Sequence, residues 1–159
     1  LAWHLRNDPR VVVMERTNLR YLSLETLGIQ VDLVTLDVSF ISLVKVWPAV
    51  SQLLRPGGEV LSLVKPQFEA GRSRVGKRGV VRDPATHLDV LTSLCVQAYE
   101  MGFDVMGTWF SPIKGAEGNV EFWIYMRRGT PGSRAGLDRA SIEKSALATV
   151  QAARAAFGG

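Results

Sequence analysis

Short apolar runs that alternate with longer helical patterns constrain this chain more than any other feature of its sequence. Residues 11–15 (VVVME), 31–37 (VDLVTLD) and 58–65 (GEVLSLVK) are strand-sized runs of the kind that form buried strands. Between the second and third runs, residues 41–54 have helical apolar spacing, with Pro48 as a kink or a second helix start. This alternation predicts an α/β protein with a doubly wound sheet.

The second half of the chain predicts one long helix and two antiparallel strands. The helix begins after Asp83, a capping residue, has Pro84 in its first position, and ends at Gly102. Aromatic and β-branched runs at 103–111 and 119–128 are joined by a Gly-rich connection, which is typical of antiparallel neighbours. An antiparallel pair at the end of a parallel sheet resembles the methyltransferase variant of the Rossmann-like architecture.

The composition is that of one globular domain. The 159 residues are 47% hydrophobic and 21% charged, which excludes a disordered chain, and the net charge of +4 permits a nucleic-acid partner. A single cysteine, Cys95, excludes an internal disulfide and is expected to be buried in the long helix. One cysteine and two histidines do not suffice for a zinc-type metal cluster.

No signal peptide is visible in the first residues of the chain. The first residues are charged and no apolar run is long enough to cross a membrane, so we expect no membrane partner and a cytoplasmic protein. The sequence begins at Leu1, and its first eight residues read like the last turns of a helix. We therefore expect the chain to be part of a longer protein.

A lysine closes the third apolar run. Lys65 follows LSLV and precedes Pro66, which favours extended backbone before it and should end the strand there. A surface lysine could extend its charge to solvent from this position. The tip of a central strand is not a free surface, however, and ligands of open α/β sheets bind at the carboxyl ends of strands. Lys65 is therefore a candidate site residue.

Acids at strand ends are the other candidates. Asp37 ends the second run and could instead cap the next helix, and Glu15 ends the first run and could hold a ribose diol or cap a turn. Glu121 stands in an apolar strand, where a carboxylate needs a use or a solvent-facing edge, whereas Glu117 in the preceding loop is a solvated rival. Because adjacent strand tips lie about 5 Å apart, an amine flanked by two carboxylates is geometrically reasonable.

Five strings together resemble one known family. ERTNLR, DLVTLDVSFISL, LVKPQFEAG, GVVRDP and SPIKGAEGNVEFW occur in this order and are similar to the TlyA, or haemolysin-A-type, ribosomal RNA 2′-O-methyltransferases of the FtsJ-type class. The resemblance divides the chain into a partial methyltransferase domain at 1–128 and, at 129–159, a flexible connector with an amphipathic helix. It implies a Rossmann-like, S-adenosylmethionine-dependent sheet truncated at its N-terminal side, without the first strand and its Gly-rich loop.

The resemblance also implies a set of catalytic residues. The family uses a Lys-Asp-Lys-Glu tetrad, whose last three members match Asp37, Lys65 and Glu121 by motif. The first lysine has no match, and we expect it upstream of Leu1 with the Gly-rich loop and the family's small RNA-binding domain. On its own the chain is therefore expected to bind the cofactor poorly and to have little or no activity.

Cofactor contacts are implied by the same motifs. The family's acid that holds the cofactor ribose matches Glu15, and we expect Arg16, Asp37 and Val38 to contribute to the same S-adenosylmethionine site.

A run of cations follows Lys65 directly. Spaced arginines and lysines with glycines between them suit phosphate contacts, although a solvated mobile loop would look the same. The expected RNA-binding residues are Arg72, Arg74, Lys77, Arg78 and Lys114. The implied partner is ribosomal RNA or a ribosomal subunit.

Other functions remain open from the sequence. A nicotinamide-dependent dehydrogenase would use Glu15 equally well, but Lys65 has no natural role in hydride transfer. A membrane-active haemolysin would need the last helix, which lacks tryptophan and has mixed charges. A non-catalytic RNA-binding protein is the third alternative. A sheet without its first strand also leaves edges through which the protein can self-associate.

Overall fold

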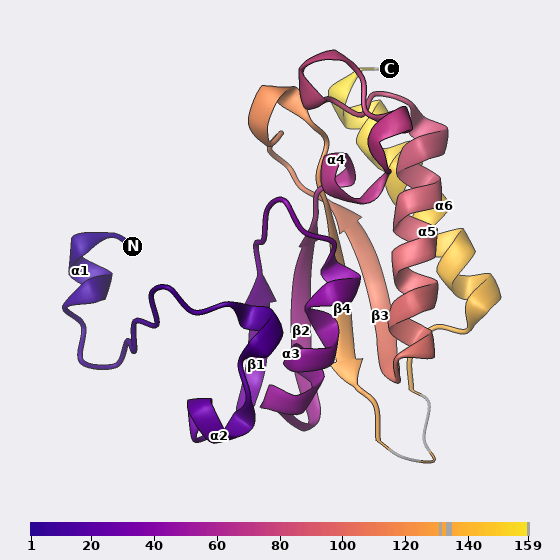
Figure 1. Cartoon of the computed structure of the whole chain (residues 1–159). Helices are drawn as coiled ribbons and strands as arrows, with labels where there is room; N and C mark the ends of the chain where they lie inside the picture. Colours follow the sequence, from indigo (N-terminus) through magenta and orange to yellow (C-terminus); the bar gives the residue numbers. More distant parts are fainter. Residues whose placement is uncertain (131, 133–134, 159) are drawn as a thin grey trace.

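A four-stranded mixed sheet organises the chain, in the order β1-β2-β4-β3 (Figure 1). The computed structural model describes residues 1–130, 132 and 135–158. β1 pairs with β2 in parallel, and β4 runs antiparallel to both β2 and β3. The strands are β1 (Val31–Leu36), β2 (Leu54–Val64), β3 (Phe103–Phe110) and β4 (Phe122–Arg128). The predicted α/β class and the antiparallel pair are confirmed.

Two long helices and several short ones accompany the sheet. Figure 1 shows α5 and α6 side by side along β3, and α6 is held there by Thr149, whose Oγ1 lies 2.8 Å from Oγ1 of Thr108. Pro48 stands near the start of α3, so the prediction of a second helix start is confirmed. The helices are α1 (Trp3–Arg6), α2 (Leu24–Leu27), α3 (Trp47–Leu53), α4 (Pro66–Glu69), α5 (Pro84–Glu100) and α6 (Arg139–Phe157).

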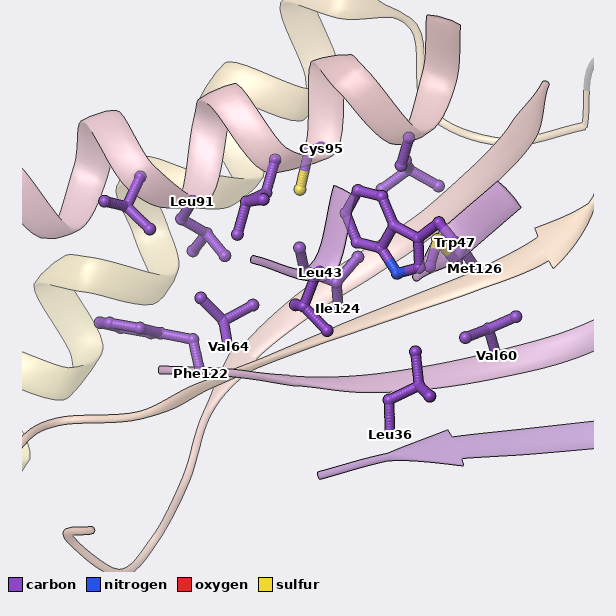
Figure 2. Packing of buried hydrophobic residues seen from close by; sticks show 14 of the residues in the cluster. Leu36, Leu43, Trp47, Val60, Val64, Leu91, Cys95, Phe122, Ile124 and Met126 are labelled. Carbon is purple, nitrogen blue, oxygen red and sulfur yellow. The ribbon is translucent and has the colours of Figure 1, made fainter. Parts of the chain in front are cut away.

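The core lies between one face of the sheet and the helices α3, α5 and α6. Figure 2 shows Trp47 of α3 and Cys95 of α5 facing Ile124 of β4, and all three are buried. Trp47 also donates a hydrogen bond from Nε1 to the hydroxyl of Ser62 in β2, at 3.2 Å. The prediction for Cys95 is confirmed, and burial raises the pKa of its thiol to about 12. The opposite face is more open, with Trp109 of β3 exposed.

The strand predicted at residues 11–15 is wrong. This segment has no strand pairing, and Val12 is 84% exposed. Figure 1 shows α1 and the chain after it standing apart from the sheet, so the run has no neighbour with which to form a ladder. An apolar run becomes a strand only when a partner satisfies its backbone groups.

The region around the predicted connector falls partly outside the described residues, at 131, 133 and 134. On either side of it, Gly129 donates its N–H to the carbonyl of Gly102, and Leu137 donates to the carbonyl of Val105. Asp138 then caps α6 by accepting a hydrogen bond from the N–H of Ser141. Within the described part of the chain, no helix is both long and apolar enough to cross a bilayer.

Candidate active site

Lys65 stands where β2 ends. β2 closes at Val64, Lys65 has extended backbone angles, and Pro66 is the first residue of α4. The carbonyl of Lys65 accepts the N–H of Phe68, which starts the short helix. The lysine side chain is thus anchored between a central strand and a helical turn, as the KP dipeptide predicts.

The amine of Lys65 is bound by the tip of the neighbouring strand. Its Nζ lies 2.6 Å from Oδ1 of Asp37, the residue directly after β1, and donates to the hydroxyl of Ser39 at 3.1 Å. The Lys65 side chain is only 15% exposed, whereas that of Asp37 is 68% exposed. The pair is therefore open to solvent on the aspartate side, where a substrate could approach.

Glu121 completes the cluster from the other side of β2. Val64 pairs with Phe122 in the antiparallel register, so the next pair along the two chains brings Lys65 opposite Glu121. Glu121 is 8% exposed. Burial raises the pKa of the Glu121 carboxyl, Lys65 acts against this shift, and Asp37 adds to it. The amine and both acids therefore converge on one rim of the sheet, as we predicted from their places at three strand ends.

The carboxylate of Glu121 lies close to the backbone of a glycine. A Cβ on Gly115 would lie 2.1 Å from Oε1 of Glu121, closer than any real contact. Gly115 also donates its N–H to the carbonyl of Asn119 at 2.8 Å, which closes the loop that leads into β4. Gly115, the first glycine of KGAEGN, therefore allows the backbone to lie close to Glu121.

Asn119 ties the two loops around the site together, and sequence reasoning missed it. Its buried amide accepts the N–H of Val81 at 3.0 Å and donates to the carbonyls of Gly79 at 3.0 Å and Ala116 at 3.1 Å. A buried side-chain amide needs such partners. The only sequence signal was an asparagine after glycine in a turn, which does not reveal a partner far away in the chain.

Phe40 is a second residue that sequence reasoning missed. It follows Ser39, has a φ of +63°, and is 89% exposed. Its ring lies 4.8 Å from that of Phe68 in α4. A bulky residue in the left-handed region is an uncommon and strained arrangement. It presents an aromatic face next to the residues that bind Lys65.

The four predicted cofactor residues lie in two separate segments of the chain. Asp37 and the half-buried Val38 lie at the tip of β1, but Glu15 is exposed and forms an ion pair with Arg6. Arg16 is also exposed and has a φ of +57°. The described residues thus fit S-adenosylmethionine only in part, and the roles of Glu15 and Arg16 stay predictions.

The predicted RNA-binding cations lie mainly in the segment 71–83, which we call the basic loop. The side chain of Arg74 is already paired within the protein: it donates to the carbonyl of Ala70 at 2.9 Å and to Asp89 at 3.0 Å. Arg72, Lys77 and Arg78 are exposed and form no ion pair with any described residue; Lys114 is likewise exposed. Their role in RNA binding stays a prediction.

Comparison with known proteins places this geometry in a family. The FtsJ-like methyltransferase family model matches residues 1–128. The chain is 51% identical over 128 residues to a candidate rRNA methyltransferase, YqxC, of Bacillus subtilis, and covers 45% of it. It is 47% identical over 130 residues to the 16S/23S rRNA (cytidine-2'-O)-methyltransferase TlyA of Mycobacterium tuberculosis, and covers 48% of it. These matches use 79% and 82% of the chain, which spans about half the length of these curated relatives.

Two solved structures have the same fold. A candidate hemolysin from Streptococcus thermophilus superposes with a TM-score of 0.87 at 39% identity, over 99% of this chain and 55% of that one. A candidate hemolysin from Lactococcus lactis gives 0.80 at 41% identity, over 90% and 69%. The family match, these relatives and the strand-tip cluster together mean that the chain belongs to the FtsJ-like methyltransferase family.

Proposed function

We propose that the natural protein containing this chain transfers a methyl group from S-adenosylmethionine to a ribose 2′-hydroxyl of ribosomal RNA. The observation that carries this proposal is the placement of Lys65 between Asp37 and Glu121 at one rim of the sheet. The names of the related rRNA methyltransferases favour the same chemistry and the same substrate class. Such a protein would work in the cytoplasm, and its self-association through the β1 edge stays a prediction.

Methyl transfer requires that the ribose hydroxyl be aligned with the methyl group and that its proton be removed. S-adenosylmethionine, when bound, supplies an electrophilic methyl group on a sulfonium. A ribose hydroxyl is a weak acid, so its proton has to be drawn away as the new C–O bond forms. We assign Lys65 to orient this hydroxyl and to accept its proton, and Asp37 and Ser39 to hold the amine in place.

Glu121 supports this arrangement from the buried side. It opposes Lys65 across the strand register and adds negative charge near the amine. In the described part of the chain, the cluster holds two acids but only one amine, whereas the family's tetrad has a second lysine that finds no match here. We therefore expect this chain alone to have little or no activity, and the complete protein to supply what releases the proton.

Phe40 suits a role in holding the target nucleotide. Single-stranded RNA bases stack on exposed aromatic rings. The exposed ring of Phe40 stands one residue from Ser39, which binds Lys65, and Phe68 supports it from α4. We propose that the target base stacks on this ring while its ribose reaches Lys65.

The basic loop suits the RNA backbone. It follows α4 directly, and its exposed cations face solvent rather than described acids, apart from Arg74. Structured RNA is recognised mainly by shape and phosphate contacts, which flexible lysines and arginines provide. The loop would fix the strand that carries the target nucleotide.

A mapping experiment tests the proposal. The natural gene product is incubated with methyl-labelled S-adenosylmethionine and ribosomal subunits, and the RNA is digested to nucleosides for mass spectrometry. The proposal predicts a 2′-O-methylated nucleoside. Label on a base instead of the ribose, or RNA binding without any transfer, would contradict it.

A further inference from the structure

A pocket lies beside the proposed site, at the C-terminal end of α6. It encloses about 410 Å³, a volume in the range of small-molecule sites. Four segments line it: the last turns of α6, the end of the basic loop, the start of α5 and the loop before β4. Figure 1 shows the C-terminus at the same end of the molecule as α4. Lys65 lies between the end of β2 and the start of α4, and is therefore at this end too.

The pocket is cationic. Arg82, Lys114 and Arg154 line it, each from a different segment, and no acid is among its described lining residues. In the part of the chain that the structure describes, these three side chains have no ion-pair partner. His87 in the wall adds no charge: burial lowers its pKa, and its Nε2 binds the carbonyl of Val81 at 3.0 Å. Three unpaired cations around one cavity favour an anion.

An aromatic side chain holds this arrangement in place. The Nζ atom of Lys114 lies 4.9 Å from the ring centre of Phe157, a cation–π distance. Phe157 in turn packs edge-on against Phe110 of β3, with 5.8 Å between ring centres. The lysine is thus pre-oriented toward the pocket by the last turn of α6, and Val80, Val120 and Val150 supply apolar wall.

The pocket is continuous with both parts of the proposed RNA surface. Arg82 and Val80 also line a neighbouring pocket, with Lys77, Arg78 and Asp83 of the basic loop. On the other side, Lys114 precedes Gly115, the residue that the Glu121 carboxylate approaches closely. A strand of RNA that follows the basic loop to the site would therefore pass Arg82, Lys114 and Arg154.

We infer that this pocket binds one nucleotide of the RNA substrate outside the target position. The three cations would hold its phosphate, and the apolar walls would accept its sugar or base. This inference rests on the proposed function, and it gives α6, which lies beyond the residues of the family match, a direct part in RNA binding. An acidic protein segment is the competing occupant, but the apolar walls and the cavity volume favour a nucleotide.

Salt-dependent binding tests the inference. Binding of the natural gene product to purified ribosomal RNA is measured against salt for Arg154→Gln and for Lys114→Gln/Arg154→Gln. The matched control is Lys144→Gln, which removes an exposed cation elsewhere on α6. Removing each cation that binds a phosphate should lower the salt slope by about one, and the double variant should bind about tenfold more weakly at physiological salt.

The outcomes separate this inference from the proposed function. If the unaltered protein neither binds nor methylates ribosomal RNA, the proposed function fails. If it does both, but the two variants match Lys144→Gln, the inference alone is overturned. Polyglutamate that binds as tightly as a short single-stranded RNA, with the same loss in both variants, would identify an acidic-protein site and also overturn it.

Discussion

Oδ1 of Asp37 lies 2.6 Å from Nζ of Lys65, across the tips of the neighbouring parallel strands β1 and β2. The contact joins an exposed acid to a largely buried amine. Glu121 approaches the same amine from the antiparallel strand on the other side. One central strand thus presents a lysine between two acids.

Neutralising the free cations of the basic loop should weaken RNA binding. Arg72, Lys77 and Arg78, replaced together by glutamine, would remove up to three phosphate contacts and lower the salt slope by about three. Fluorescence anisotropy with ribosomal RNA over a salt series measures this slope. Arg127→Gln, which breaks an ion pair with Glu59 instead, is the control. An unchanged salt slope in the triple variant would show that the basic loop does not contact RNA.

Removing the amide of Asn119 should destabilise the protein and loosen both loops. Asn119→Ala leaves the buried N–H of Val81 without its acceptor, which costs about 1–3 kcal/mol. Thermal unfolding should shift down by roughly 2–10 °C in a domain of this size. Ser93→Ala, on the exposed face of α5, should change little. Equal midpoints for the two variants would show that the loops are held by other contacts.

Glu69 should make the stability fall as pH rises from mildly acidic values. Its carboxylate accepts the N–H of Leu43 at 2.9 Å, and burial raises its pKa above the ordinary 4.5 in spite of that bond. The folded state therefore binds this proton more tightly than the unfolded state, so the stabilisation is complete below 4.5 and is lost as pH rises through the raised value.

Glu69→Gln isolates this effect, because glutamine keeps an acceptor for Leu43 but does not titrate. Urea unfolding between pH 4.5 and neutrality should show a smaller decline in stability for the variant than for the unaltered protein. Asp83 and Asp138 have lowered pKa values and act in the opposite direction at lower pH, in both proteins alike. Superimposable pH profiles would mean that Glu69 titrates normally.

A methyl group at position 115 should disturb the site more than the fold. In Gly115→Ala the new Cβ would overlap the carboxylate of Glu121, which would have to shift from its place in the cluster. Methyl transfer by the natural gene product should fall by about 10²-fold or more, with little change in the unfolding midpoint. Ala116→Ser, an exposed change in the same loop, is the control. Full activity in Gly115→Ala would remove Glu121 from the mechanism.

The parts of the site that could be predicted are those fixed by local pattern. Lys65 before proline marks a strand end, and Asp37 ends an apolar run, so both had to lie near strand tips. The run at residues 11–15 has an equally clear pattern but no strand beside it, and pattern alone does not reveal a missing partner.

The residues of the site that could not be predicted are placed by tertiary contacts. Nothing local indicates that Phe40 takes a left-handed conformation, or that Asn119 bonds to a loop about forty positions away. The same holds for Arg154, whose place beside Lys114 depends on how α6 packs on β3. Such residues become visible only when separate segments are assembled.

Turnover of a Lys65 variant tests the central claim most directly. Methyl transfer from labelled S-adenosylmethionine to ribosomal subunits is measured for Lys65→Ala in the natural gene product, with Lys45→Ala, an exposed lysine, as the control. We predict a loss of about 10²–10⁴-fold in turnover with RNA binding retained. Transfer by Lys65→Ala at the unaltered rate would contradict the assignment of Lys65 to the reaction centre.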